Sequence, residues 1–188
     1  MCVERSIFMS IGFQNKLNKI INDKEYMKCV EDVFYSDAVK KMDEFTQHGS
    51  TTTLEHCINV SYHSYKLSKL LHLDYKSAAR AGLLHDLFLY DWHLLPKGDP
   101  FFQKHGFAHP QKALENANKY FALNDKEKDI IEKHMWPLTL RKIPKYKESF
   151  LISFVDKYTS TSETVVPIAR KAGNYAMLLV TMFYGILH

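Results

Sequence analysis

The stretch Arg80–His93, RAGLLHDLFLYDWH, decides the fold and raises the main question about this chain. It places His85 and Asp86 side by side at the end of a run of small and apolar residues. Ala81, Gly82 and His85 share a narrow helix face that a second helix can approach closely. An ionisable pair in such a setting is costly unless a partner offsets its charge. The stretch therefore predicts a closely packed helix whose end carries a pair in need of a partner.

The segments around this stretch also carry helix signals. Thr52 and Glu55 have the spacing of a capping box, which predicts a helix from there to about Leu71. Asp74 is expected to cap the helix that carries the histidine–aspartate pair. No pair of alternating strands joined by a hairpin turn is evident. The sequence therefore predicts an all-α fold, a single helical bundle.

Further helices are predicted on both sides of this centre. The segment 95–107, LPKGDPFFQKHGF, contains two prolines and two glycines and predicts a loop. A helix should begin after this loop, at His109–Pro110, because proline is favoured at the first helical position. The other predicted helices are one or two over Lys16–Lys41, one that begins at His109–Pro110, one capped by Asn124 with Glu127 and ended by Pro137, and one from Glu148 to about Thr161.

The length and composition predict one structural domain. A chain of 188 residues that is 46% hydrophobic can close one substantial core. Within it we expect N-terminal helices over residues 1–48, a metal-binding core over 49–161 and an apolar C-terminal helix over 162–188. The apolar run Tyr175–Leu187 is shorter than the ~20 residues that a membrane-spanning helix needs. It should pack on the bundle or on a second copy of the chain, as in a homodimer.

The charge balance and the cysteines exclude several classes of protein. The chain has 25 Lys and Arg against 21 Asp and Glu, and the basic residues are scattered. This pattern predicts neither nucleic-acid nor membrane binding. Cys2, Cys29 and Cys57 are an odd number without metal or redox spacing, which suits a reducing compartment. Glu4 and Arg5 interrupt the apolar N-terminus, so no secretory signal is predicted, and we expect a cytoplasmic protein.

A metal ion is the partner that chemistry favours for the histidine–aspartate pair. Imidazole nitrogen and carboxylate oxygen are ligands of Mn, Fe and Zn. Two residues do not complete a site, but four more stand at helix ends or on apolar helix faces, from which they can point inward. These are His56, His109, His134 and Asp156. Together the candidates supply four imidazoles and two carboxylates.

Each further candidate has a competing structural interpretation. His63 follows His56 by seven residues, but about 10 Å of helix separates them, so both cannot bind one ion. His134 could stabilise a helix C-terminus through its charge instead of binding metal. Asp156 lies in an apolar helix where an unpaired charge is costly. The side chain of Lys157 points about 100° away from it, so a metal is the better partner.

One histidine is chosen over a close neighbour. His105 and His109 are four residues apart, which on a continuous helix would make a ligand pair. Gly106 and Pro110 argue that no helix joins them. His109 is therefore taken as the ligand, and His105 is kept as a substrate contact.

The order of the candidate ligands along the chain resembles that of the HD superfamily of metal-dependent phosphohydrolases, whose pattern is H…HD…H…H…D on a helical bundle. The resemblance covers roughly Gly49 to Thr161 and is carried by TTTLEHC, GLLHDL, HPQKAL, EKHMWP and SFVDKY. It implies two divalent metal ions, with Fe or Mn ahead of Zn, Mg or Ni. It assigns His56, His85, Asp86 and Asp156 to the first ion, and His109 and His134 with a bridging Asp86 to the second.

The resemblance and the charge of such a centre predict a hydrolase, in which His85 and Asp86 are also catalytic. Two divalent ions, two carboxylates and a bridging hydroxide would leave about one positive charge to meet a phosphoryl oxygen. The hydroxide would attack a small phosphate ester or nucleotide. Basic residues that could contact its phosphate are Arg80, Lys104, Arg141, Lys142 and Lys157, together with His105.

The sequence also departs from some HD families. A lysine that follows the pair in the His-Asp-Ile-Gly-Lys motif is replaced here by Leu89, so a cation must come from elsewhere. The Gly-Tyr-Pro motif of cyclic-di-GMP phosphodiesterases is absent. The six-ligand pattern is similar to small dinuclear HD proteins, among them diadenosine tetraphosphate hydrolases. It is equally similar to mixed-valent di-iron oxygenases, and a non-catalytic metal-bound interaction module is the third hypothesis.

Overall fold

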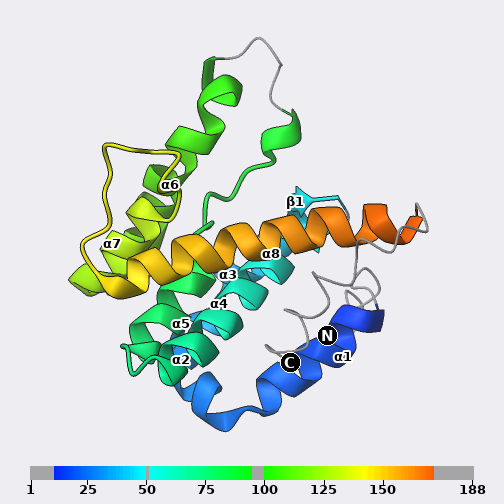
Figure 1. Ribbon diagram of the computed structural model, residues 1–188, viewed down its shortest axis with the longest axis vertical. Helices are drawn as coiled ribbons and strands as arrows, with labels where there is room; N and C mark the ends of the chain where they lie inside the picture. The colour runs from blue at the N-terminus through cyan, green and yellow to red at the C-terminus, as the bar shows by residue number, and fades with distance from the viewer. Residues whose placement is uncertain (1–10, 50, 95–99, 172–188) are drawn as a thin grey trace.

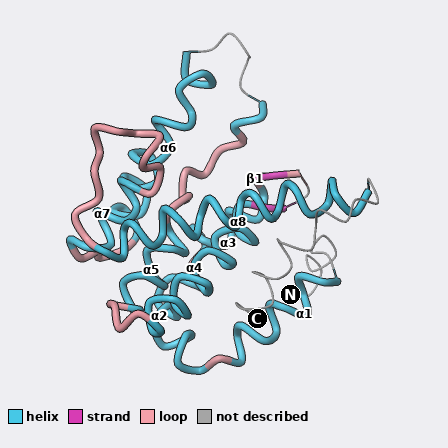
Figure 2. The backbone as a smooth tube through the Cα atoms, viewed as in Figure 1, coloured by secondary structure: helices cyan, strands magenta, loops and turns pink. Residues whose placement is uncertain are grey.

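The computed structural model describes residues 11–49, 51–94 and 100–171 of the chain. These residues form helices and one short hairpin, which confirms the all-α prediction (Figure 1, Figure 2). None of the helices in these ranges is both long and apolar enough to cross a membrane. The cytoplasmic location stays a prediction. The helices are α1 (Ile11–Asn22), α2 (Lys24–Phe34), α3 (Asp37–Lys40), α4 (Thr53–Leu70), α5 (Tyr75–Leu84), α6 (Pro100–Tyr120), α7 (Asp125–Lys133) and α8 (Lys147–Lys171), with single-turn helices η1 (Lys41–Glu44) and η2 (Trp92–Leu94).

Three predicted helix starts are confirmed by their capping hydrogen bonds. Thr52 and Glu55 form a reciprocal capping box at the start of α4. Asn124 and Glu127 do the same for α7. The Asp74 carboxylate accepts a hydrogen bond from the first turn of α5. Side chains thus satisfy backbone N–H groups that have no partner inside each helix.

The helices α4 and α5 pack together at the centre of the described fold. A Cβ atom at Gly82 would lie 3.0 Å from the Cα of Ser61 and 3.3 Å from its nitrogen. The Ser61 hydroxyl donates a hydrogen bond of 2.6 Å to the carbonyl of Ala79. Gly82 therefore sets how closely α5 approaches α4, as the small residues of this face predicted.

The other long helices surround this pair. α8 crosses α4, while α2 and α7 pack on α5 and α6 packs on α7 (Figure 1). Arg80 links three of these helices, because its guanidinium pairs with Asp32 at 2.7 Å and with Glu127 at 2.8 Å. Arg80 is therefore engaged in structural ion pairs. The largest fully buried side chains include Tyr26, Tyr65, Leu83, Leu84, Leu87, Ile130 and Ile152.

The predicted helix start at His109–Pro110 was wrong. Helix α6 is continuous from Pro100 to Tyr120, contains Pro110 in its interior and joins His105 to His109. A proline removes one backbone hydrogen bond and crowds the carbonyl four residues earlier, here that of Gly106. α6 nevertheless packs along α7. Tertiary packing therefore outweighs the local break that the proline and the glycine indicate.

A short hairpin precedes α4 and was not predicted. Strand β1 (Thr46–His48) pairs antiparallel with β2 (Thr51–Thr52). Gly49 in the turn has a φ of 59°, a conformation that glycine adopts without steric cost. Strands this short carry too few residues for an alternating pattern. Only their position against η1 and α4 in the folded chain reveals them.

Two predictions about the ends of the chain stay open. The apolar run Tyr175–Leu187 lies outside the described residues, so the homodimer stays a prediction. The division into segments 1–48, 49–161 and 162–188 also stays a prediction. Helix α8 continues beyond the expected end at Thr161 to Lys171.

Candidate metal centre

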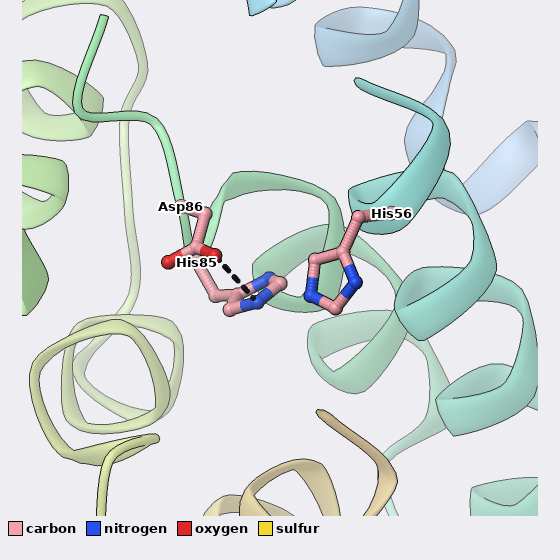
Figure 3. A group of neighbouring side chains, drawn as sticks. All are labelled: His56, His85 and Asp86. Atoms are coloured by element: carbon pink, nitrogen blue, oxygen red, sulfur yellow. Dashed lines mark ion pairs between the residues drawn. The ribbon is translucent and has the colours of Figure 1, made fainter. Parts of the chain in front are cut away.

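The six predicted ligands converge inside the bundle, at most 7% exposed. We call them the His/Asp cluster. His56 points in from α4, and His85 and Asp86 face it from the end of α5 (Figure 3). The remaining members are His109 on α6, His134 at the end of α7 and Asp156 on α8. Five consecutive helices, α4 to α8, thus deliver side chains that lie up to 100 residues apart in the sequence to one place.

One half of the cluster lies around His85. The Nε2 atom of His85 is 3.4 Å from Asp86 Oδ2 and 3.6 Å from Asp156 Oδ1. The same Asp156 oxygen is 3.1 Å from the Nε2 atom of His56. Two imidazole nitrogens and two carboxylates therefore face one another at distances that a cation can bridge.

The other half of the cluster lies around His109 and His134. Their Nε2 atoms are 2.9 Å apart. The Oδ1 atom of Asp86 lies 3.3 Å from His109 Nε2 and 3.5 Å from His134 Nε2. Asp86 thus presents one oxygen to each half, which is the placement that a bridging carboxylate requires.

The cluster fits a metal ion by a direct structural test. Two of its buried atoms, His85 Nε2 and Asp86 Oδ1, make no hydrogen bond within the described structure. A buried polar atom without a partner typically costs about 1–3 kcal/mol. A cation would satisfy these lone pairs, and imidazole with carboxylate is a usual donor set for transition metals. Three subsets have ligand atoms within 4.8 Å of one another: His56, His85 and Asp86; His85, His134 and Asp156; and Asp86, His109 and His134.

Helix ends fix the tautomers of two histidines. His85 follows the last residue of α5, and its Nδ1–H donates to the carbonyl of Gly82 at 2.8 Å. His134 follows the last residue of α7, and its Nδ1–H donates to the carbonyl of Ile131 at 2.9 Å. Carbonyls in the last turn of a helix lack partners within it. Each Nε2 is consequently turned toward the cluster.

Two further residues hold cluster members and were not predicted from the sequence. The Nδ1–H of His56 donates to Glu163 Oε2 at 2.9 Å. Gln47 on β1 donates from Nε2 to Asp86 Oδ2 at 2.7 Å. The side-chain oxygen Oε1 of Gln47 accepts a hydrogen bond from the Thr53 hydroxyl. Glu163 lies seven residues after Asp156, a spacing on one helix face that could have revealed it. Gln47 had no such signal, because the hairpin itself was not predicted.

The electrostatics of the cluster follow from burial and from its opposite charges. Burial acts to lower the pKa of His85, but chiefly the Asp86 carboxylate raises it well above its usual value. Burial acts to raise the pKa of Asp86, but His85 and His109 hold it well below its usual range. Burial lowers the pKa of His134 to about 3, which leaves this imidazole neutral. The ionised Asp86 and the neutral His134 are already in the forms that bind metal, whereas His85 would release its Nε2 proton when a metal binds.

The predicted substrate contacts are placed as follows. Lys157 donates to the carbonyls of His134 and Ser153, at 3.0 and 3.2 Å. Lys142 pairs with Glu132 at 3.1 Å, and Arg141 is exposed. The side chains of Lys104 and His105 lie outside the described part. Substrate binding by these residues, which are Lys104, His105, Arg141, Lys142 and Lys157, stays a prediction.

The fold and the cluster define an all-α protein with a buried His/Asp group that can hold metal ions. Over 86 residues the chain is 35% identical to a protein of Bacillus subtilis (strain 168) named "Putative phosphohydrolase YueE". The match covers 43% of this chain and 49% of that protein, so it spans about half of the relative's length. No family model and no solved structure matches the chain.

Proposed function

We propose that the protein is a metal-dependent phosphohydrolase of the HD type that cleaves a small phosphate ester or nucleotide. The observation that carries the proposal is the His/Asp cluster, in which buried His85 Nε2 and Asp86 Oδ1 have no hydrogen-bond partner among the described residues. The partial similarity to a protein named as a phosphohydrolase supports it. The order of the motifs in the sequence supports it as well.

The cluster would hold two divalent ions, with Fe or Mn preferred. His56, His85, Asp86 and Asp156 would hold one, and His109 and His134 would hold the other with Asp86 between them. When bound, such ions lower the pKa of water and neutralise charge on a phosphoryl oxygen.

The protein contributes orientation and burial to this chemistry. Backbone carbonyls aim the Nε2 lone pairs of His85 and His134 inward. Gln47 holds Asp86 through one oxygen and leaves the other facing His109 and His134. Side chains fixed in this way need little reorganisation when a charged substrate arrives. The cluster is buried, which strengthens electrostatic interactions inside it.

A metal-reconstitution assay tests the proposal. The purified full chain is stripped with a chelator, reloaded with Mn²⁺ or Fe²⁺, and screened for phosphate release from phosphomonoesters, phosphodiesters and nucleotides. We expect bound metal and hydrolysis of at least one of these classes. An Asp86→Ala variant should lose hydrolysis and at least one bound ion, whereas Asp91→Asn should retain the metal content and the activity of wild type.

Other outcomes would favour the alternative hypotheses. Oxygen consumption by the iron-loaded protein, with an EPR signal of a mixed-valent pair and no phosphate release, would replace the proposal with a di-iron oxygenase. Metal binding without either reaction would favour a non-catalytic interaction module. Absence of metal binding by the wild-type chain would refute the proposal.

A further inference from the structure

His56 differs from two other histidines of the cluster in how its ring can be fixed. His85 and His134 follow helix ends, where free backbone carbonyls accept their Nδ1–H groups. His56 lies in the first half of α4, where the carbonyls of the preceding turn accept hydrogen bonds within the helix. A side chain must therefore supply the acceptor for its Nδ1–H.

Glu163 supplies that acceptor from α8. Its Oε2 atom lies 2.9 Å from His56 Nδ1, and its Oε1 atom accepts a hydrogen bond of 2.9 Å from Asn59 Nδ2. Asn59 stands one helical turn after His56 on the same face of α4. Both carboxylate oxygens are thus engaged, and the Glu163 side chain is only 10% exposed.

A positive charge on α1 also acts on this buried carboxylate. Burial lowers the pKa of Lys16 on α1 to about 8, while the charge of Glu163 acts in the opposite direction. Glu163 therefore experiences a favourable field from α1 in addition to its hydrogen bonds from α4. The hydrogen bonds that hold the carboxylate in place both come from α4.

We propose that Glu163 is the positioning residue of His56: it fixes the tautomer with hydrogen on Nδ1, so that Nε2 presents its lone pair to a metal ion. Asn59 in turn orients Glu163. The inference rests on the proposed metal centre and assigns it a residue that the sequence motifs do not contain. Carboxylates that accept the second ring N–H of a metal-binding histidine typically contribute about 10–100-fold to metal affinity.

Three variants of the full chain test this role. Glu163→Ala removes the acceptor. Glu163→Gln keeps an acceptor oxygen for His56, while its new N–H can donate to Asn59 Oδ1, which has no hydrogen-bond partner within the described part of the chain. Glu148→Gln is the matched control, because Glu148 is a similarly buried carboxylate on α8, with a side chain 7% exposed, whose partners are Lys126 and the backbone of Asp74.

The measurement is the affinity of each metal-free protein for Co²⁺, determined by competition with a chromophoric chelator, together with its thermal unfolding. We expect Glu163→Ala to bind Co²⁺ about 10–100-fold more weakly than wild type. Glu163→Gln should recover part of this loss, since it restores the hydrogen bond without the charge. Glu148→Gln should lower the unfolding temperature and leave the Co²⁺ affinity unchanged. If Glu163→Ala fails to fold, Glu163→Gln serves as the test in its place. The proposed role then requires that Glu163→Gln bind Co²⁺ more weakly than wild type.

The outcomes separate this inference from the proposed function. Wild-type protein that binds no Co²⁺ would overturn both. Wild-type protein that binds Co²⁺ while Glu163→Ala binds it equally well would overturn only the role of Glu163. An equal loss in Glu148→Gln would also overturn that role, because the effect would then follow from general destabilisation.

Discussion

Replacement of Asp86 by asparagine should remove the carboxylate that the two halves of the His/Asp cluster share. Gln47 Nε2 donates to Asp86 Oδ2 at 2.7 Å, so the asparagine oxygen should turn toward Gln47. Its NH₂ group would then take the place of Oδ1, which lies 3.3 Å from His109 Nε2 and 3.5 Å from His134 Nε2. The substitution keeps the size of the side chain but points hydrogen atoms to where a cation would bind.

The magnitude follows from the geometry of the cluster. Of the three ligand subsets, the one formed by His85, His134 and Asp156 is independent of Asp86. At most one ion should therefore remain bound per chain. Loss of an outer-shell partner costs about 10–100-fold in metal affinity, so loss of a direct ligand should exceed about 100-fold. This corresponds to more than about 2.8 kcal/mol of binding free energy.

The assay is the metal content of Asp86→Asn after dialysis, determined by elemental analysis, together with phosphate release under Mn²⁺ or Fe²⁺. The far-UV circular dichroism should match that of wild type, because the hydrogen bond to Gln47 is kept. Asp91→Asn is the control and should retain metal, since the Asp91 carboxylate accepts a hydrogen bond from the backbone N–H of His93 and lies 3.2 Å from the Nδ1 atom of its ring. An Asp86→Asn protein with wild-type metal content and turnover would refute the assignment of Asp86 as the shared ligand.

Three further predictions concern packing, pH and metal removal. Gly82→Ala should lower the free energy of unfolding by about 1–3 kcal/mol in urea denaturation, because its methyl group would lie 3.0 Å from the Cα of Ser61; an unchanged midpoint would contradict this. Burial acts to raise the pKa of Glu148, but Lys126 lowers it below 4.5, so its stabilising contribution should be present above pH 4.5 and lost as the pH falls through the lowered pKa. In Lys126→Met the unfolding free energy should accordingly fall less between neutral and acid pH, and an identical pH dependence would argue against the ion pair. Chelation should abolish phosphate release by the wild-type protein. It should also lower the unfolding temperature, because bound metal stabilises only the folded state. Addition of Mn²⁺ or Fe²⁺ should restore both, as measured by activity and by calorimetry.

The sequence by itself determined the features that depend on a few neighbouring residues. Capping at Thr52, Asp74 and Asn124 was readable because the side chain and the backbone group that it satisfies are three residues apart. The small residues before His85 predicted a close helix approach for the same local reason. The types of the candidate ligands and their order along the chain were also fixed at this level.

Tertiary structure decided which side chains meet and how their rings are turned. His56 and Asp156 are 100 residues apart in sequence, and their contact depends on α8 crossing α4. Packing against α7 keeps α6 continuous through Pro110. Glu163 and Gln47 reach the His/Asp cluster from α8 and from the hairpin, respectively. Such contacts depend on the packing of whole helices, whose free energy is spread over many distant residues, so no local pattern encodes them.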